Sequence, residues 1–132
     1  NLEEQPFVLA LTNEDGLVTY IDAAEEIGGL NKGLRPMQLL AGALAGCMSI
    51  DVLSILRKQR ITVSTYSVKI IANRRDGIPS SFETIELQFW ADTGVPIDKF
   101  QHAVRLSHEK YCSVSASLHP DIQITISVKH QL

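Results

Sequence analysis

Two cysteines are the residues of this 132-residue chain whose type and context could support redox chemistry. Cys47 lies in the apolar run LLAGALAGCMSIDV, residues 39–52, and Cys112 lies at HEKYCSVSASL, where charged residues meet a Ser-rich turn. Two cysteines so far apart in the chain do not make the disulfide framework of a small secreted scaffold. One thiol on a buried helix and one near a helix start can instead form a redox pair.

Each cysteine also has a simpler interpretation. A buried cysteine such as Cys47 commonly acts as a small inert hydrophobe, and Cys112 can be a half-buried turn residue. Cys112 is the better placed for reactivity, because the serines that follow it (Ser113, Ser115 and Ser117) are typical of caps and turns. A thiol at the N-terminus of a following helix would have a lowered pKa and more thiolate.

The histidines offer two further alternatives. His108 and Cys112 have the spacing of one helix face and Cys47 could be a third metal ligand, but no zinc pattern with two close pairs is present, so we predict no metal. A Cys–His hydrolase is possible if Asp51 orients His108 as the base. The other histidines are scattered and are expected to be ordinary surface or edge residues: His102, His119 and His130.

Composition limits the partners and the location. The chain has 12 basic and 15 acidic residues and no basic block, so neither nucleic acid nor an anionic membrane is an expected partner. The longest apolar stretch, residues 39–50, is too short to span a bilayer, and the first residues lack the layout of a signal peptide. The cytoplasm is the expected location, where a thiol pair is more often redox or metal-binding than structural.

Two helices are predicted to position the cysteines. The segment 36–60 starts at a proline that suits a first helical turn and is apolar nearly all round, so this central helix should be buried in a larger assembly. Its small residues allow a neighbouring backbone to approach closely: Ala41, Gly42, Ala43, Ala45 and Gly46. A second helix over 97–110 has one apolar side and leads to Cys112.

Five strands complete the predicted single domain, 1–132. Segments 7–12 and 17–21 read as a hairpin, followed by a Gly-containing loop to residue 35 that fits no phosphate-binding spacing. Segments 61–74 and 82–90 should form an antiparallel pair within 61–91, with a bulge near Ser64. The second helix falls within 96–117, and 122–129 is the last strand. This order predicts an α+β fold with antiparallel sheet.

The two cysteine segments together resemble the OsmC/Ohr family, that is, osmotically inducible protein C and the organic hydroperoxide resistance proteins. The resemblance rests on GLRPMQLLAGALAGCMSIDV followed, after two strands, by HEKYCSVSASL, and it covers about residues 33–128. The most similar subgroup is the OsmC-like redox proteins. The resemblance implies antiparallel sheets wrapped around two long central helices in an intertwined homodimer, with sites at the subunit interface.

The resemblance also implies a reaction and its partners. In the family the first cysteine, here Cys47, attacks the O–O bond of a small organic peroxide and becomes a sulfenic acid. The second, here Cys112, condenses with it to a disulfide, which a dithiol reductant then reduces. No cofactor takes part in this cycle.

Three positions depart from the pattern of the family's peroxidases. Those proteins carry a Glu just after the motif Pro and an Arg from the N-terminal region, whereas here Met37 follows Pro36 and no Arg precedes Arg35. Gln38 stands where the similar subgroup has Glu, and we expect it to orient a partner without bringing charge. Ser113 stands where relatives often have Pro. The alternative function is therefore a weakly catalytic or non-catalytic protein that senses redox state or binds a small apolar ligand.

Overall fold

The computed structural model describes residues 1–131, and the chain divides into two compact units. One unit runs from Asn1 to Leu40 and the other begins at Ala41. The division falls inside the first long helix, so the predicted central helix contributes to both. The assignment of the whole chain to one domain stays a prediction.

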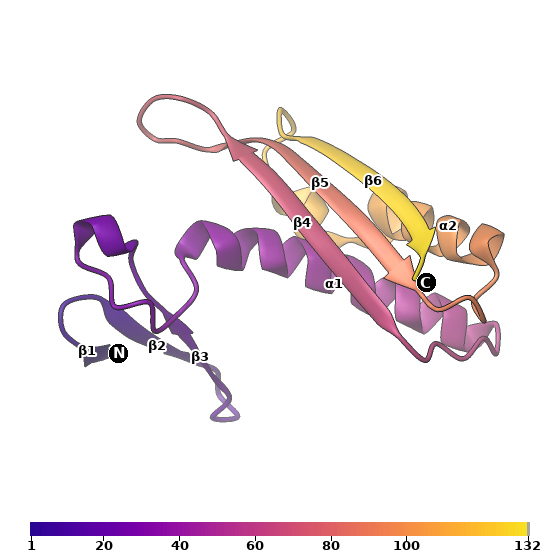
Figure 1. Ribbon diagram of the computed structural model, residues 1–132, viewed down its shortest axis with the longest axis horizontal. Helices are drawn as coiled ribbons and strands as arrows, with labels where there is room; N and C mark the ends of the chain where they lie inside the picture. Colours follow the sequence, from indigo (N-terminus) through magenta and orange to yellow (C-terminus); the bar gives the residue numbers. More distant parts are fainter. Residues whose placement is uncertain (132) are drawn as a thin grey trace. The chain divides into compact units, whose positions relative to one another are not determined.

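The first unit contains a three-stranded antiparallel sheet in the order β1–β2–β3 (Figure 1). Its strands are β1 (Leu2–Glu4), β2 (Val8–Thr12) and β3 (Val18–Ile21). The predicted hairpin between the last two is confirmed. Asn13 closes its turn, because the side-chain Oδ1 accepts hydrogen bonds from the backbone N–H groups of Asp15 and Leu17, and Gly16 supplies a φ of 81°.

The loop after β3 is organised around Asp22, whose side chain is buried at 1% exposure. Its carboxylate accepts three backbone N–H bonds, from Ala23 at 2.7 Å, Leu30 at 2.9 Å and Lys32 at 3.2 Å. Burial raises the pKa of Asp22, but these donors and the charge of Lys32 outweigh it and leave the pKa below its usual range. The loop is thus held by a carboxylate in its ionised form.

Two glycines of this loop allow its backbone to pack closely. A Cβ on Gly29 would lie 1.9 Å from the carbonyl oxygen of Ala23, and one on Gly33 would lie 2.6 Å from the backbone of Tyr20. The loop also contains a short 3₁₀ helix, η1 (Glu25–Ile27). The glycines therefore serve loop geometry, in agreement with their interpretation as turn residues.

The predicted central helix is α1 (Pro36–Lys58), which starts at the predicted proline and ends two residues before the predicted end. Four side chains on one side of it have no exposed surface: Leu44, Met48, Val52 and Leu56. On the opposite side Ile50 is 71% and Leu53 is 38% exposed. Within this chain α1 is buried along one side only, so its other side is apolar but uncovered.

By length and composition alone α1 could cross a membrane, with a mean hydropathy of 2.0 over its most apolar window. The whole helix is longer than the run 39–50 on which the sequence argument against a span rests. Core helices of soluble proteins satisfy the same criterion, and one side of α1 packs in the core of the second unit. The absence of a membrane partner stays a prediction.

The second unit contains the sheet β4–β5–β6, formed by β4 (Tyr66–Arg74), β5 (Phe82–Ala91) and β6 (Gln123–His130). The predicted antiparallel pairing of β4 with β5 is confirmed. The α+β class is confirmed as well, but β6 runs parallel to β5, where we expected antiparallel sheet throughout. The physical reason is the long connection from residue 92 to 122, which carries helices and returns the chain to the same end of the sheet.

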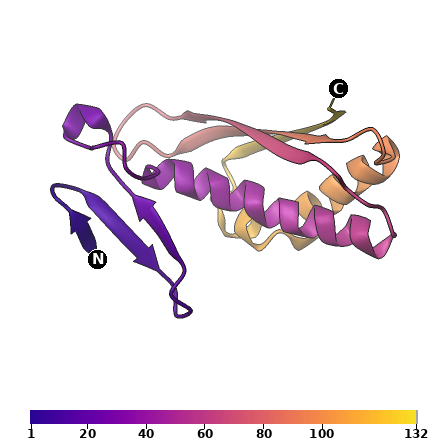
Figure 2. The ribbon, with the colours of Figure 1, turned by 60° about the horizontal axis from the view of Figure 1, so that its bottom comes forward.

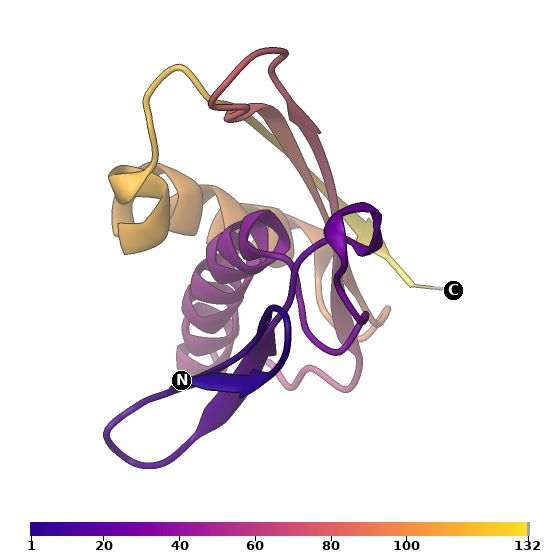
Figure 3. The same cartoon turned by 90° about the vertical axis from the view of Figure 1, so that its left-hand side faces the viewer.

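One face of this sheet forms the core with α1 and α2 (Ile97–Leu106), which lie on the same side of it (Figures 2 and 3). From β5, Ile85, Leu87 and Phe89 point into this core and have no exposed surface, in agreement with the predicted alternation. Phe100 from α2 is also fully buried and lies with its ring 6.2 Å from that of Tyr66. The face is therefore the platform on which both helices rest.

Two local predictions in this unit are wrong. Residues 61–65 are not a strand and no bulge occurs near Ser64; instead the Asp92 carboxylate accepts the N–H bonds of Ser64 and Thr65, at 2.8 and 3.1 Å, and turns the chain into β4. The predicted helix 97–110 ends as α2 at Leu106 and continues as a π-helix, η2 (Ser107–Tyr111). A short helix, α3 (Ser113–Ser117), follows Cys112. Side-chain hydrogen bonds accompany both differences, and hydrophobic periodicity does not report them.

Candidate redox site

Cys47 lies in the middle of α1, at the border between the buried and the uncovered side of the helix. Its thiol is free and partly exposed. Met48, which follows it, is fully buried, whereas Ile50 is exposed. A small molecule that reaches this region from solvent can therefore contact Cys47 without opening the core.

Cys112 lies between η2 and α3 and is buried, with 5% of its surface exposed. It caps α3, because its Sγ accepts a hydrogen bond from the backbone N–H of Ser115 at 3.3 Å. The helix start that the sequence predicts is thus present. The predicted lowering of the Cys112 pKa is nevertheless wrong: burial raises the pKa, and the Ser115 bond offsets this only in part.

The structure brings the two cysteines together. The Cys47 side chain lies near enough to Cys112 to raise the pKa of Cys112 further. Both thiols are free. Two neighbouring free thiols, one partly exposed and one buried, are candidates for a disulfide.

A polar contact beside the thiols anchors Cys112 to α1. The hydroxyl of Ser107, which has no exposed surface, donates a hydrogen bond of 2.8 Å to Oδ2 of Asp51, one turn after Cys47 on α1. The carbonyl of Ser107 accepts the backbone N–H of Cys112 at 2.8 Å. Sequence reasoning missed Ser107, and the one available signal was a carboxylate, Asp51, in an otherwise apolar helix.

The two histidine alternatives find no support here. Asp51 bonds to Ser107, and the buried Nδ1 of His108 has no hydrogen-bond partner among residues 1–131, so the oriented base of a Cys–His hydrolase is not formed. Among the same described residues, no group of three or more His, Cys, Asp or Glu side chains could hold a metal ion.

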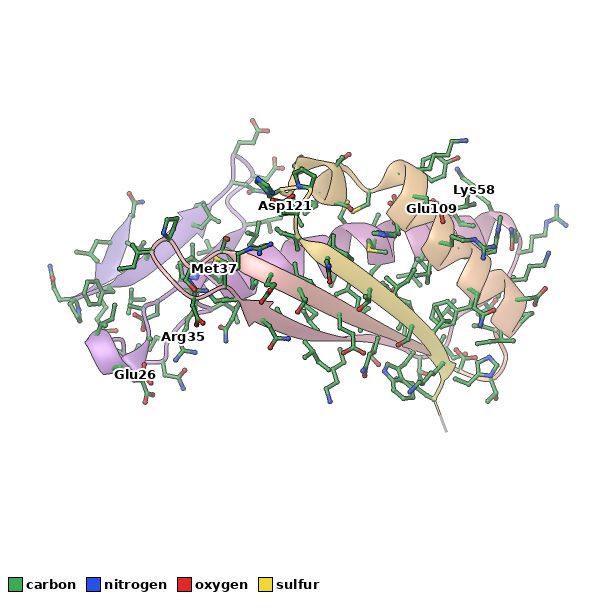
Figure 4. The ribbon with its side chains drawn as sticks, turned by 90° about the horizontal axis from the view of Figure 1, so that it is seen from above. Glu26, Arg35, Met37, Lys58, Glu109 and Asp121 are labelled. Carbon is green, nitrogen blue, oxygen red and sulfur yellow. The ribbon has the colours of Figure 1, made fainter. Side chains whose placement is uncertain are left out.

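Gln38 belongs to the unit that ends at Leu40, and its side chain has a defined local role. Its Oε1 accepts the backbone N–H of Arg35 at 3.0 Å, at the start of α1, where Figure 4 labels Arg35 and Met37. A side chain at the third helical position that reaches back to the residue before the helix is one half of a capping box. The prediction that Gln38 orients a partner in the redox site stays a prediction.

Comparison with known proteins adds a family and several relatives. The model of a family described as OsmC-like protein matches residues 29–127, which include both cysteines. Protein YhfA of Escherichia coli strain K12 is 40% identical over 99 residues, which is 74% of this chain and 73% of that protein.

Solved structures share the fold over nearly the whole chain. A protein from Aquifex aeolicus VF5 is 31% identical, with a TM-score of 0.69 over 98% of this chain and all of that one. A protein from Legionella pneumophila, described as an organic hydroperoxide resistance protein OsmC, has a TM-score of 0.67 over 96% of this chain and 99% of that one. At 20% identity the latter likeness concerns the fold alone.

Proposed function

The chain belongs to the OsmC-like protein family, and from this premise we propose that it reduces small organic hydroperoxides with the thiols of Cys47 and Cys112. The observation that carries the proposal is the proximity of these two thiols, one partly exposed and one buried. The name of the Legionella protein, which refers to organic hydroperoxide resistance, supports the choice of substrate class.

The cycle has three balanced steps. The Cys47 thiolate attacks the distal oxygen of the hydroperoxide, the O–O bond breaks, Cys47 becomes a sulfenic acid, and the leaving alkoxide takes a proton from water to give an alcohol. The Cys112 thiol then attacks the Cys47 sulfur, and water leaves as the disulfide forms. A dithiol reductant donates two electrons and two protons, restores both thiols and is itself oxidised to a disulfide.

The unequal environments of the thiols support this order. Cys47 is the more exposed, so a substrate meets it first. Burial raises the pKa of Cys112, which disfavours its thiolate and so its direct reaction with a peroxide. Cys47 is accordingly the peroxidatic residue and Cys112 the resolving one.

The working assembly in this proposal is a homodimer in the cytoplasm. Ile50 and Leu53 leave an apolar strip of α1 uncovered in the single chain, and a second copy of α1 would cover it. A reducing compartment keeps both thiols ready between cycles.

The test mixes pre-reduced protein with one equivalent of an organic hydroperoxide and follows free-thiol loss against time. Two thiols per chain should disappear much faster than for an ordinary exposed cysteine, which has only a small thiolate fraction at neutral pH. Cys47→Ser should abolish the fast loss. Cys112→Ser should leave one trapped sulfenic acid that a diketone probe labels.

A rate no faster than that of a free cysteine would overturn the peroxidase proposal. The chain would then be better explained as the redox-sensing or apolar-ligand-binding alternative. The observation that favours this alternative is that the amide of Gln38, in place of the family's Glu, brings no charge and is occupied by the N–H of Arg35. Extraction of the purified protein and mass spectrometry for a bound apolar molecule would test it.

A further inference from the structure

The hydrogen bond between Ser107 and Asp51 has no part in the reaction steps above, yet it joins the two elements that carry the thiols. Asp51 is one helical turn after Cys47 on α1, so the two side chains lie on the same side of that helix. Ser107 begins η2, the turn that ends next to Cys112. The bond is 2.8 Å long, and Ser107 is completely buried.

The backbone of η2 transmits this anchor to the second thiol. The Cys112 N–H bonds to the Ser107 carbonyl at 2.8 Å, which closes the wide turn of a π-helix. Glu109, labelled in Figure 4, marks the middle of that turn. A regular α-helix would place the residues after Ser107 at a different angle, so the irregular turn determines where Cys112 lies.

We propose that Asp51 and Ser107 are positioning residues that hold Cys112 against Cys47 and so favour the disulfide between them. The carboxylate accepts a charge-assisted bond from a hydroxyl that has no exposed surface, which makes it stronger than a fully exposed bond. Without it, the polar tie between Ser107 of η2 and Asp51 of α1 is lost, and the Cys112 sulfur samples positions from which it cannot reach Cys47.

This inference rests on the proposed function in that the two thiols form a disulfide, but not on a peroxide being the oxidant. Glutathione disulfide can take its place: two thiols are oxidised, two protons move, and two glutathione thiols are produced. The equilibrium constant of this exchange measures how favourably Cys112 is held near Cys47. It does so without any hydroperoxide in the assay.

The experiment measures that equilibrium constant for the whole chain in glutathione buffers. Ser107→Ala and Asp51→Ala should each lower the constant about tenfold, because each removes the bond, and this is a shift of about 30 mV in reduction potential. The double variant should lower the equilibrium constant no further than either single variant, since both substitutions remove the same contact. Asp51→Asn keeps an oxygen that accepts the Ser107 hydroxyl and should stay within about threefold of wild type.

Ser49→Ala is the matched control. Ser49 is a partly buried serine within α1, whose hydroxyl donates to the Ala45 carbonyl at 2.6 Å and accepts from the Tyr66 hydroxyl at 2.9 Å, and neither bond involves a thiol. Its loss should lower the melting temperature while leaving the glutathione equilibrium unchanged. A purely structural role for Ser107 would give the same result as this control.

Two outcomes would overturn the inference: Ser107→Ala and Asp51→Ala with wild-type equilibrium constants, or Asp51→Asn as impaired as Asp51→Ala. If Ser107→Ala fails to fold, the comparison of Asp51→Ala with Asp51→Asn alone tests the inference. A wild-type protein that forms the disulfide with glutathione but ignores hydroperoxide would contradict the peroxidase proposal and leave this inference standing. A wild-type protein that forms no disulfide contradicts both.

Discussion

At the scale of the residue, the environments of the two thiols matter more than their presence. Cys112 accepts an N–H bond at the start of α3, which by itself would stabilise its thiolate. Burial and the adjacent Cys47 act in the opposite direction and are together stronger, so the pKa of Cys112 is raised. The sequence indicates the cap, through the serines after Cys112, but burial depends on tertiary packing that no local pattern reports.

The first prediction concerns this pKa. A carbon NMR titration of the Cys112 Cβ should give a pKa above the ordinary cysteine value in wild type. In Cys47→Ser the pKa should fall part of the way back, because the neighbouring thiolate is removed while burial remains. A pKa at or below the ordinary value in wild type would show that the cap, not burial, controls the thiol.

The same shift has a consequence for stability. The folded state holds the Cys112 proton more tightly than the unfolded chain does. The resulting contribution of Cys112 to the free energy of unfolding is therefore fully present below the ordinary cysteine pKa. It is lost as the pH rises through the folded-state value. Chemical denaturation of wild type and Cys112→Ser at neutral and alkaline pH should therefore show a steeper alkaline loss in wild type.

At the scale of the element, the helices could be predicted more fully than the strand pairing. Periodicity located α1 and the buried side of β5, because a repeat of apolar residues directly reflects which face meets a core. It could not reveal that β6 lies parallel to β5 or that the second helix widens at Ser107. The first depends on the path of the chain from 92 to 122, and the second coincides with a tertiary bond from Ser107 to Asp51.

The start of α1 carries a prediction of its own. Gln38→Ala should lower the free energy of unfolding by about 0.5–1 kcal/mol, because the Arg35 N–H loses its side-chain acceptor. Gln38→Glu should be at least as stable as wild type, since a carboxylate accepts the same bond and interacts favourably with the helix N-terminus. Urea denaturation measures all three proteins.

Gln101→Ala is the control for this series. Gln101 is an exposed glutamine within α2, so its loss removes the same side chain from a helix surface away from any cap. It should change stability little or raise it slightly, because alanine is the better helix former. If Gln38→Ala behaves like Gln101→Ala, the capping role is contradicted and a role for Gln38 in orienting a partner gains weight.

At the scale of the whole molecule, α1 has more apolar surface than the single chain buries. The sequence predicts a helix buried nearly all round, while in the single chain only one side is buried and Ile50 is 71% exposed. Both observations agree if a second copy covers the uncovered side, which is the proposed homodimer. The pattern of apolar residues along α1 predicts that this surface needs a partner, but it does not predict where the partner lies.

The homodimer gives the last prediction. Ile50→Arg places a charge on the uncovered side of α1, and desolvating an unpaired charge at an interface is costly. Analytical ultracentrifugation should show a dimer for wild type and a monomer for Ile50→Arg. The matched control is Ile78→Arg, the same substitution at an isoleucine that is fully exposed in the connection between β4 and β5, and it should remain dimeric. A monomeric wild type would contradict the homodimer. A dimeric Ile50→Arg would show that the dimer interface lies elsewhere, because the side of α1 around Ile50 could not accept an unpaired charge if a second chain covered it.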